Sequence, residues 1–166
     1  MPSPDEMNAY HAQILAQRDN FEAILNSMAE GILTVDGTLG ITTFNRSAKR
    51  ITGISRTEAL GMRCTCFFHQ ILEGQECPIC KALMRNDYME EIEYEISRHD
   101  GQRRIVLVTT NPLIDSAIRR TGVVLVLHDI QELRDLSEKL KGRYRFHNIF
   151  GKNHKMQVNV FNKCNT

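Results

Sequence analysis

The chain has 166 residues, of which 42% are hydrophobic and 25% are charged. This composition excludes a disordered or fibrous chain and is typical of one globular domain with extensions. The longest uninterrupted apolar run, residues 123–127, is far shorter than the about 20 residues that cross a bilayer, and no basic stretch leads into an apolar one as in a secretory signal. We therefore expect a cytoplasmic protein that does not contact a membrane.

The first predicted element is a helix that carries a narrow apolar stripe. Between Met7 and Met28, mostly apolar positions recur at steps of three and four residues, as on one face of a helix. So narrow a stripe is typical of a seam between two helices rather than of a face on a large core. We predict a dimerisation helix over residues 1–20, continuing to about residue 28, whose contact residues are Met7, Tyr10, Ile14, Phe21 and Ile24.

After this helix the pattern changes to two short strands and a short helix. The strands are predicted over residues 32–35 and 39–44, on either side of an Asp-Gly hairpin signal. Asn45 is placed to cap the helix that follows, because its side chain can accept a hydrogen bond from a free backbone N–H. Gly53 is expected to end that helix.

The middle of the chain predicts further short helices and then three strands. Ser55 and Glu58 fit a capping box, and residues 78–85 begin with a proline, which is tolerated at the first position of a helix. In the next segment Ile92, Tyr94 and Ile96 alternate with glutamates, as on the two faces of a strand. Three strands are predicted, over residues 89–98, 104–112 and 122–128.

A second amphipathic helix is predicted at the end of this region. From Asp129 the apolar period becomes helical again, with Leu133 and Leu140 at heptad-like steps. We predict a linker helix over residues 132–144 and add these two leucines to the predicted dimer interface. The order of elements indicates an α+β fold, with a five-stranded antiparallel sheet and helices on one face.

This order resembles a PAS domain, and four short segments carry the resemblance. Residues 21–32 resemble the helix that leads into the first PAS strand, and residues 44–48 resemble the start of the first inner helix. Asp100-Gly101 resembles the turn before the long strand, and residues 122–130 resemble the last strand and its Asp-Ile exit, although Gln131 stands where a threonine is usual. The resemblance implies a PAS sensory domain over residues 21–131, with flanking signalling helices.

The tail resembles a different kind of unit. Residues 144–157 are similar to the opening of the AAA+ domain of sigma-54-dependent activators, written Phe-x-x-Ile-Ile-Gly-x-Ser-x-x-Met, with Phe150 and Asn153 as departures. No Gly-x-x-x-x-Gly-Lys-Ser/Thr loop for phosphates follows. The resemblance implies the sensory region of such an activator, truncated at the AAA+ start, with residues 145–166 as remnant and unmatched tail. Six Lys or Arg spread over the last 26 residues are read as part of that unit, and we expect no direct contact with nucleic acid.

Four cysteines form the most specific chemical signal in the chain. Cys64, Cys66, Cys77 and Cys80 lie within 17 residues in the spacing C-x-C, ten residues, C-x-x-C. In a cytosolic protein this spacing indicates a metal or redox site more readily than a structural disulfide framework. Four thiolates can bind a zinc ion or an iron-sulfur cluster, and the sequence does not choose between the two.

Two alternatives to metal binding stay open. A C-x-x-C pair can act as a thiol-disulfide switch because one thiol of the pair often has a lowered pKa. Free cysteines are also often buried as small apolar side chains. Cys66 lies outside the Gly-x-x-Cys and Cys-x-x-Cys elements that resemble a cysteine-containing PAS subtype, so His69 is an alternative fourth ligand.

These observations predict a non-enzymatic, homodimeric sensor, because no nucleophile with a base and no nucleotide loop is present. A signal at the cysteine segment, which we expect to be redox state, a metal or a small ligand, would change how the helices pack on the sheet. The last strand would pass that change to the exit helix and to the AAA+ ATPase domain of a full-length regulator. One alternative is a ligand-free PAS dimerisation module. Another is the PAS sensor of a histidine kinase, although no His-Glu phosphoacceptor pattern follows the exit helix.

Overall fold

The computed structural model describes residues 1–85 and 91–144. The predicted AAA+ remnant at residues 145–166 lies outside the described residues, as does the start of the strand predicted over residues 89–98. In chain order the described elements are α1 (Pro4–Ser27), β1 (Gly31–Asp36), β2 (Ile41–Phe44), α2 (Arg46–Thr52), α3 (Arg56–Ala59), α4 (Cys64–Ile71), α5 (Pro78–Arg85), β3 (Ile92–Ser97), β4 (Arg103–Ile114), β5 (Arg120–Asp129) and α6 (Gln131–Tyr144).

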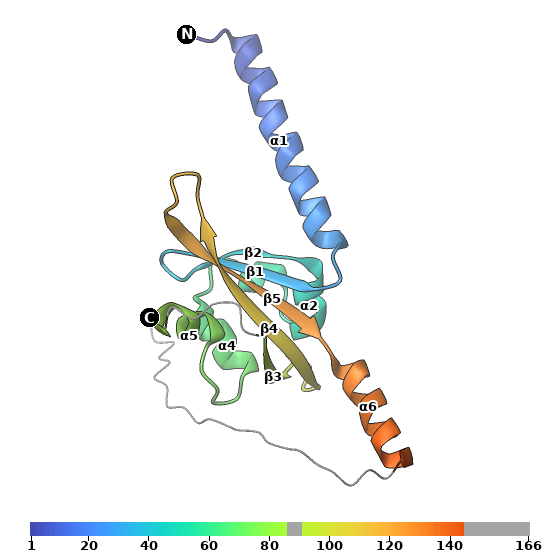
Figure 1. Cartoon of the computed structure of the whole chain (residues 1–166). Coiled ribbons are helices and arrows are strands. Elements are labelled where there is room, and N and C mark those ends of the chain that lie inside the picture. The colour runs from blue at the N-terminus through green and yellow to red at the C-terminus, as the bar shows by residue number, and fades with distance from the viewer. Residues whose placement is uncertain (86–90, 145–166) are drawn as a thin grey trace.

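The five strands form one antiparallel sheet in the order β2-β1-β5-β4-β3. The last strand of the sequence therefore lies at the centre, where Leu125 pairs with Leu33 of β1 on one side and with Thr110 of β4 on the other. Helices α2, α4 and α5 cover one face of the sheet, while α1 and α6 extend away from the body in different directions (Figure 1). The predicted α+β architecture is confirmed.

The core lies between the sheet and the short helices. Leu33, Leu125 and Leu127 are fully buried on the sheet side, and Phe67 and Phe68 of α4 are buried against them. The alternation predicted for β3 is confirmed, because Tyr94 and Ile96 are buried while the intervening glutamates are exposed. The packing of α4 on this face is what brings its first residue, Cys64, into the interior.

Asn45 fastens three elements together at the start of α2. Its side-chain oxygen accepts hydrogen bonds from the backbone N–H groups of Ala48 at 2.9 Å and of Ile32 at 2.8 Å. Its amide nitrogen donates to the carbonyls of Leu25 at 2.8 Å and of Glu30 at 3.0 Å. The predicted cap is therefore confirmed, and the same side chain also connects the end of α1 to β1.

The other predicted helix ends are also confirmed. Gly53 ends α2 with a φ of 77°, in the left-handed region that favours glycine. Ser55 and Glu58 form the capping box that begins α3. These short helices are specified by their ends, because each is too short to be stable through helix propensity alone.

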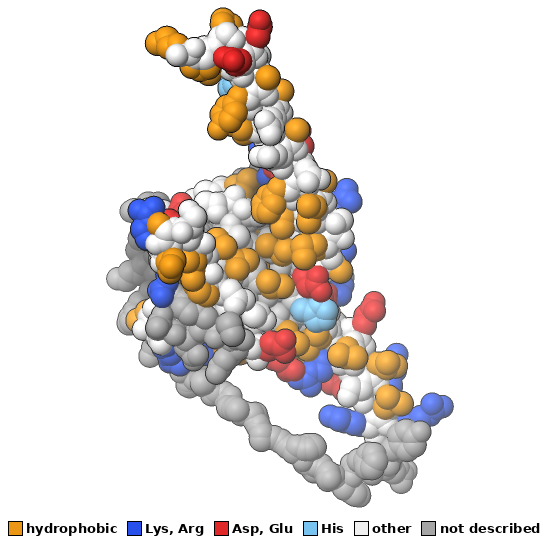
Figure 2. Space-filling view, turned by 45° about the horizontal axis from the view of Figure 1, so that its top comes forward, with side chains coloured by type: hydrophobic (Ala, Val, Ile, Leu, Met, Phe, Trp, Pro, Cys, Tyr) orange, Lys and Arg blue, Asp and Glu red, His pale blue; other side chains and the backbone are white. Residues whose placement is uncertain are grey.

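The predicted stripe lies on a helix that stands away from the body. None of the residues of α1, all of which the structure describes, is buried, and the apolar side chains along it are visible in Figure 2. The predicted interface residues are all exposed in this single chain: Met7, Tyr10, Ile14, Phe21, Ile24, Leu133 and Leu140. Among the described residues, neither α1 nor any other helix is long and apolar enough to cross a membrane.

The junction between β5 and α6 is tied to the neighbouring strands. The N–H of Ile130 donates to the carbonyl of Ile105 at 3.0 Å, and the N–H of Ile105 donates to the side-chain oxygen of Gln131 at 3.0 Å. Arg104 pairs with Asp129 at 3.2 Å, and farther along α6 an arginine pairs with a β3 glutamate. The sheet therefore continues into the exit helix through a bonded junction rather than a loose loop.

Candidate functional site

Three of the four clustered cysteines meet in space. The Sγ of Cys64 lies 3.8 Å from the Sγ of Cys77 and 4.0 Å from the Sγ of Cys80. All three sulfur atoms lie within 4.8 Å of one another. They form the three-cysteine site, which is the only group of at least three His, Cys, Asp or Glu ligand atoms so close together in the described part of the chain.

Two helix starts bring these sulfur atoms together. Cys64 is the first residue of α4, and Cys77 immediately precedes Pro78, the first residue of α5, with its carbonyl accepting from the N–H of Lys81. Cys80 is the third residue of α5 and lies within its first turn. The N-terminus of a helix carries a partial positive charge, which favours a thiolate. The fold thus places two helix N-termini at one group of sulfur atoms.

Helix α4 itself was not predicted from the sequence. It begins without a side-chain hydrogen bond at its N-cap, Arg63, so the usual Ser, Thr, Asp or Asn start signal is absent. Its buried face consists of Cys64, Phe67, Phe68 and Ile71, which follows the helical period of three and four. That period was the signal that could have revealed the helix.

The site is buried on one side and reaches the surface on the other. Cys64 is 0% exposed and Cys77 is 1% exposed, whereas Cys80 is half-buried. Hydrogen bonds from the Cys64 and Cys77 thiols, together with the charge of Arg63, lower the pKa of Cys80 to about 3. Cys80, the outer member of the group, is therefore the cysteine that ionises most readily.

The two inner cysteines are held in the thiol form. Burial raises the pKa of Cys77 well above its ordinary value, and the contacts of its thiol with the other two cysteines act in the same direction. The hydrogen bond from Cys77 lowers the pKa of Cys64, but its bond to Cys80 and its burial outweigh this effect and raise the pKa to about 12. The Cys77 thiol thus donates to Cys64, and the Cys64 thiol donates toward Cys80.

The structure does not bring Cys66 or His69 into this group. Cys66 follows Cys64 by two residues on α4, and two residues on a helix correspond to a rotation of about 200°. Its side chain is half-buried, and His69 is exposed on the same helix. The site that the fold assembles therefore consists of Cys64, Cys77 and Cys80.

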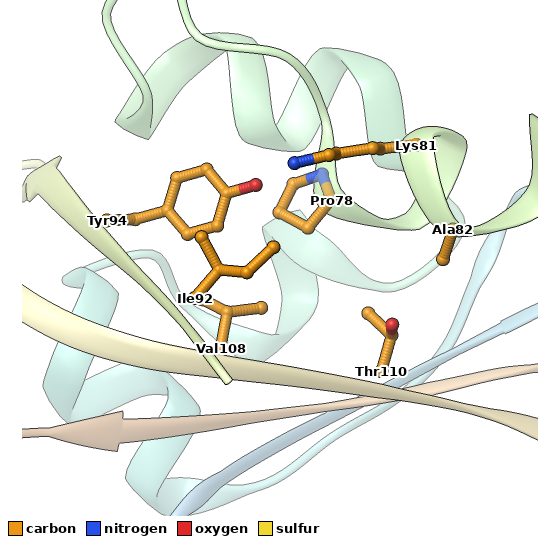
Figure 3. A pocket seen from close by; sticks show the side chains of 7 residues that line it. All are labelled: Pro78, Lys81, Ala82, Ile92, Tyr94, Val108 and Thr110. Carbon is orange, nitrogen blue, oxygen red and sulfur yellow. The ribbon is translucent and has the colours of Figure 1, made fainter. Parts of the chain in front are cut away.

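A small cavity lies between α5 and the sheet beside this site. Lys81 extends across Pro78 toward Tyr94 (Figure 3), and burial raises the pKa of Tyr94 to about 12, with Cys77 and Glu76 adding to the effect. The cavity has a volume of about 20 Å³, which is room for about one water molecule. It is lined by Pro78, Lys81, Ala82, Ile92, Tyr94, Val108 and Thr110.

Comparison with known proteins places the chain in a family. Residues 29–132, more than half of the chain, match the family described as PAS domain. A curated relative, the probable diguanylate cyclase DgcE of Escherichia coli (strain K12), is 25% identical over an alignment of 138 residues that covers 81% of this chain. This chain spans only 12% of the length of that relative.

Solved structures share the fold at low sequence identity. An RNA-binding light-oxygen-voltage receptor matches with a TM-score of 0.59 and 18% identity, over 88% of this chain and 40% of its own. The PAS domain of an HTR-like protein from Haloarcula marismortui matches with a TM-score of 0.58 and 16% identity, over 74% of this chain and 99% of its own. The DhaR(N)-DhaL complex of Escherichia coli matches with a TM-score of 0.57 and 19% identity, over 74% of this chain and 39% of that chain. These likenesses show the fold, and with the family match they establish that the chain belongs to the PAS domain family.

Proposed function

We propose that this chain is the signal-sensing and dimerisation module of a sigma-54-dependent transcriptional regulator, and that it catalyses no reaction itself. Its signal, a metal ion or a change in redox state, acts at the three-cysteine site. The observation that carries this proposal is the convergence of three sulfur atoms at the starts of two helices, on the face of a sheet whose central strand leads into α6.

A chain of packed elements supports transmission from this site to the exit helix. Helix α5, which carries Cys80, packs on β4 around Val108 and Thr110. Strand β4 pairs with β5 along most of its length, and β5 is followed at once by α6. If α5 can occupy two positions on the sheet, a ligand that binds more tightly to one of them favours that position. The change would then reach the junction at Ile105 and Ile130 through β4 and β5.

The flanking helices support the dimerisation part of the proposal. Met7, Tyr10, Ile14, Phe21 and Ile24 form one exposed apolar stripe on α1. Leu133 and Leu140 are exposed on α6. Pairing with a second copy would bury these side chains, and each such residue contributes about 1.5–3 kcal/mol when fully buried. A change in the direction of α6 would then alter the pairing of the two copies.

The assignment to a sigma-54-dependent regulator rests on the resemblance of residues 144–157, which lie mostly outside the described residues. Within such a regulator the AAA+ ATPase domain is the partner of this module. A second candidate is a ligand-free dimerisation module, which is favoured by the small cavity of about 20 Å³ between α5 and the sheet. The two candidates differ in whether the state of the cysteines changes dimerisation.

Sedimentation analysis of the purified chain tests the proposal. Its dimerisation constant is measured with the thiols reduced, with the thiols oxidised and with Zn²⁺ added, for the wild type, Cys77→Ser and the control Cys66→Ser. The proposal expects at least one state to change the constant about 10-fold in the wild type and in Cys66→Ser, but not in Cys77→Ser. An equal constant in every state and variant would eliminate the sensor and leave the dimerisation module.

A further inference from the structure

We infer that the three-cysteine site binds a single thiophilic divalent metal ion, of the zinc type, through Cys64, Cys77 and Cys80, with a fourth ligand that does not come from these cysteines. This inference deepens the proposed function, on which it rests, by naming the ligand of the sensing site. It is carried by the spacing of the sulfur atoms and by their surroundings.

The spacing fits the ligands of one tetrahedral ion. A zinc-thiolate bond of about 2.3 Å and tetrahedral angles require neighbouring sulfur atoms to lie about 3.8 Å apart. The Sγ of Cys64 lies at 3.8 Å from that of Cys77 and at 4.0 Å from that of Cys80, and the third pair lies within 4.8 Å. Only small side-chain movements separate this arrangement from an ideal set of three ligands.

An iron-sulfur cluster fits the same sulfur atoms less well. In a [4Fe–4S] cluster each thiolate binds a different iron atom, and in a [2Fe–2S] cluster only two thiolates share one iron atom, so three thiolates cannot all lie as close together as the ligands of a single ion. Cys64 and Cys77 are at most 1% exposed and packed in the core with Phe67. Close packing resists the outward shift of two side chains and two helix starts that a cluster requires.

A disulfide also accounts for less of the arrangement. Its sulfur atoms are bonded at about 2.05 Å, so the closest pair, Cys64 and Cys77, would have to move together from 3.8 Å. A disulfide would also use two of the three sulfur atoms and leave the third without a partner. A single ion is the ligand that gives all three sulfur atoms the same role.

The balance of charge and protons is met at this site. Binding M²⁺ through the thiolates of Cys64, Cys77 and Cys80 releases to solvent the protons that their thiols carry, so the ion and the three thiolates together have a net charge of −1. The N-termini of α4 and α5 and the guanidinium of Arg63 are positive and partly offset this negative charge. No oxidation or reduction is involved.

The fourth position is left for a ligand from another source. Among the residues that the structure describes, no fourth His, Cys, Asp or Glu ligand atom lies within 4.8 Å of all three sulfur atoms. Cys80 is half-buried, so the site reaches the surface at this residue. A site with three protein ligands keeps one position for water or for a small donor molecule.

Titration of the full chain with Zn²⁺ in competition with a chromophoric chelator tests this inference. We expect one ion per chain in the wild type, an affinity at least about 100-fold lower in Cys80→Ser, since even the loss of an outer-shell partner costs 10-fold to 100-fold, and little change in the matched variant Cys66→Ser. Cys80 is half-buried, so its serine variant removes a ligand with little effect on the core. Co²⁺ in place of Zn²⁺ is expected to show the intense visible spectrum of a four-coordinate thiolate site.

Three results would overturn the inference. One is an equal loss of affinity in Cys66→Ser, which would make Cys66 a ligand. Another is the uptake of several iron atoms with sulfide per chain under anaerobic reconstitution, in preference to one Zn²⁺. The third is the absence of Zn²⁺ binding by the reduced chain.

The inference and the proposed function fail in different ways. If Zn²⁺ does not bind but oxidation still changes dimerisation in the wild type and not in Cys77→Ser, the ion is excluded and the sensor remains. If one Zn²⁺ binds and neither metal nor redox state changes dimerisation, the site is a structural metal centre and the sensor is excluded.

Discussion

The Sγ of Cys77 lies 3.8 Å from the Sγ of Cys64, although 13 positions separate the two residues in the chain. The contact exists because Cys64 begins α4 and Cys77 immediately precedes α5, so that the two helix starts meet beneath the sheet. Chemistry at the sulfur atoms therefore acts on the relative position of two helices.

In the reduced, metal-free chain, Cys80 is expected to be the thiol that reacts first with an alkylating reagent in acid. Its pKa is lowered to about 3 by hydrogen bonds from Cys64 and Cys77, so it is a thiolate at about pH 5, where a thiol of pKa about 8.5 is almost fully protonated. Allowing for the lower nucleophilicity of a weakly basic thiolate, we expect labelling about 10-fold faster than that of a free reference thiol.

Peptide mapping after brief labelling with iodoacetamide identifies the modified residue. Cys80→Ser is expected to lose the fast reaction, and Cys66→Ser is expected to keep it. Labelling that begins only in alkaline solution would contradict the assignment of the thiolate to Cys80.

Much of the fold could be predicted because its signals are local. Asn45 and Gly53 mark the ends of α2, and the alternation around Tyr94 and Ile96 marks the buried face of β3. The order of the strands could not be predicted in this way, since the central place of β5 depends on pairing with β1, from which it is separated by most of the domain.

The site was predicted in part, and the reason lies in the geometry of one short helix. Cys64, Cys66, Cys77 and Cys80 were expected to form one site, and the structure brings together the sulfur atoms of Cys64, Cys77 and Cys80 but not that of Cys66. The sequence spacing had included Cys66 in the site. Residues two apart point to the same side of an extended segment, but they point to different sides of helix α4. No start signal at Arg63 indicated that this segment is a helix.

The phenol of Tyr94 is expected to make the stability of the fold depend on pH in alkaline solution. Its side chain is buried and its pKa is raised from 10.0 to about 12, first of all by this burial. Because the folded state prefers the neutral phenol, this contribution to stability is fully present below about pH 10 and is lost as the pH rises through about 12. Absorbance of the phenolate and circular dichroism, followed together, should show one tyrosine that ionises near pH 12 as the chain unfolds.

The variant Tyr94→Phe provides the control for this behaviour. It lacks the late ionisation and should unfold at a higher pH than the wild type. If every tyrosine has ionised by about pH 10 while the chain is still folded, Tyr94 is not shielded from water.

Replacing Asn45 with alanine should lower the free energy of unfolding by at least about 2 kcal/mol, because buried N–H and C=O groups lose their partners. The affected groups belong to β1, to α2, to the end of α1 and to Glu30 between α1 and β1. Asn45→Asp should cost less, since the aspartate still accepts from Ile32 and Ala48 but no longer donates to Leu25 and Glu30. Urea unfolding measures both variants.

The control for this prediction is Asn20→Ala, on the exposed surface of α1, where we expect a change within about 0.5 kcal/mol. Equal stability of Asn45→Ala and Asn20→Ala would mean that the buried side chain of Asn45 does not fasten the elements as described.

Charging the apolar stripe of α1 should weaken dimerisation. A dimer buries Ile14 in both copies, so Ile14→Glu removes two buried side chains of about 1.5–3 kcal/mol each and should raise the dissociation constant about 100-fold or more. Ala12→Glu adds the same charge on the opposite side of the helix and should have little effect. Analytical ultracentrifugation compares the two, and similar constants for both would contradict a dimer seam along this stripe.

Hydrogen exchange of the full chain with and without Zn²⁺ tests most directly whether the three-cysteine site controls the exit helix. We expect Zn²⁺ to slow exchange at the starts of α4 and α5 and to change it at the junction of β5 and α6, in the wild type and in Cys66→Ser but not in Cys80→Ser. A change confined to α4 and α5, with the junction at Ile130 and Gln131 unaffected in all three proteins, would contradict the account.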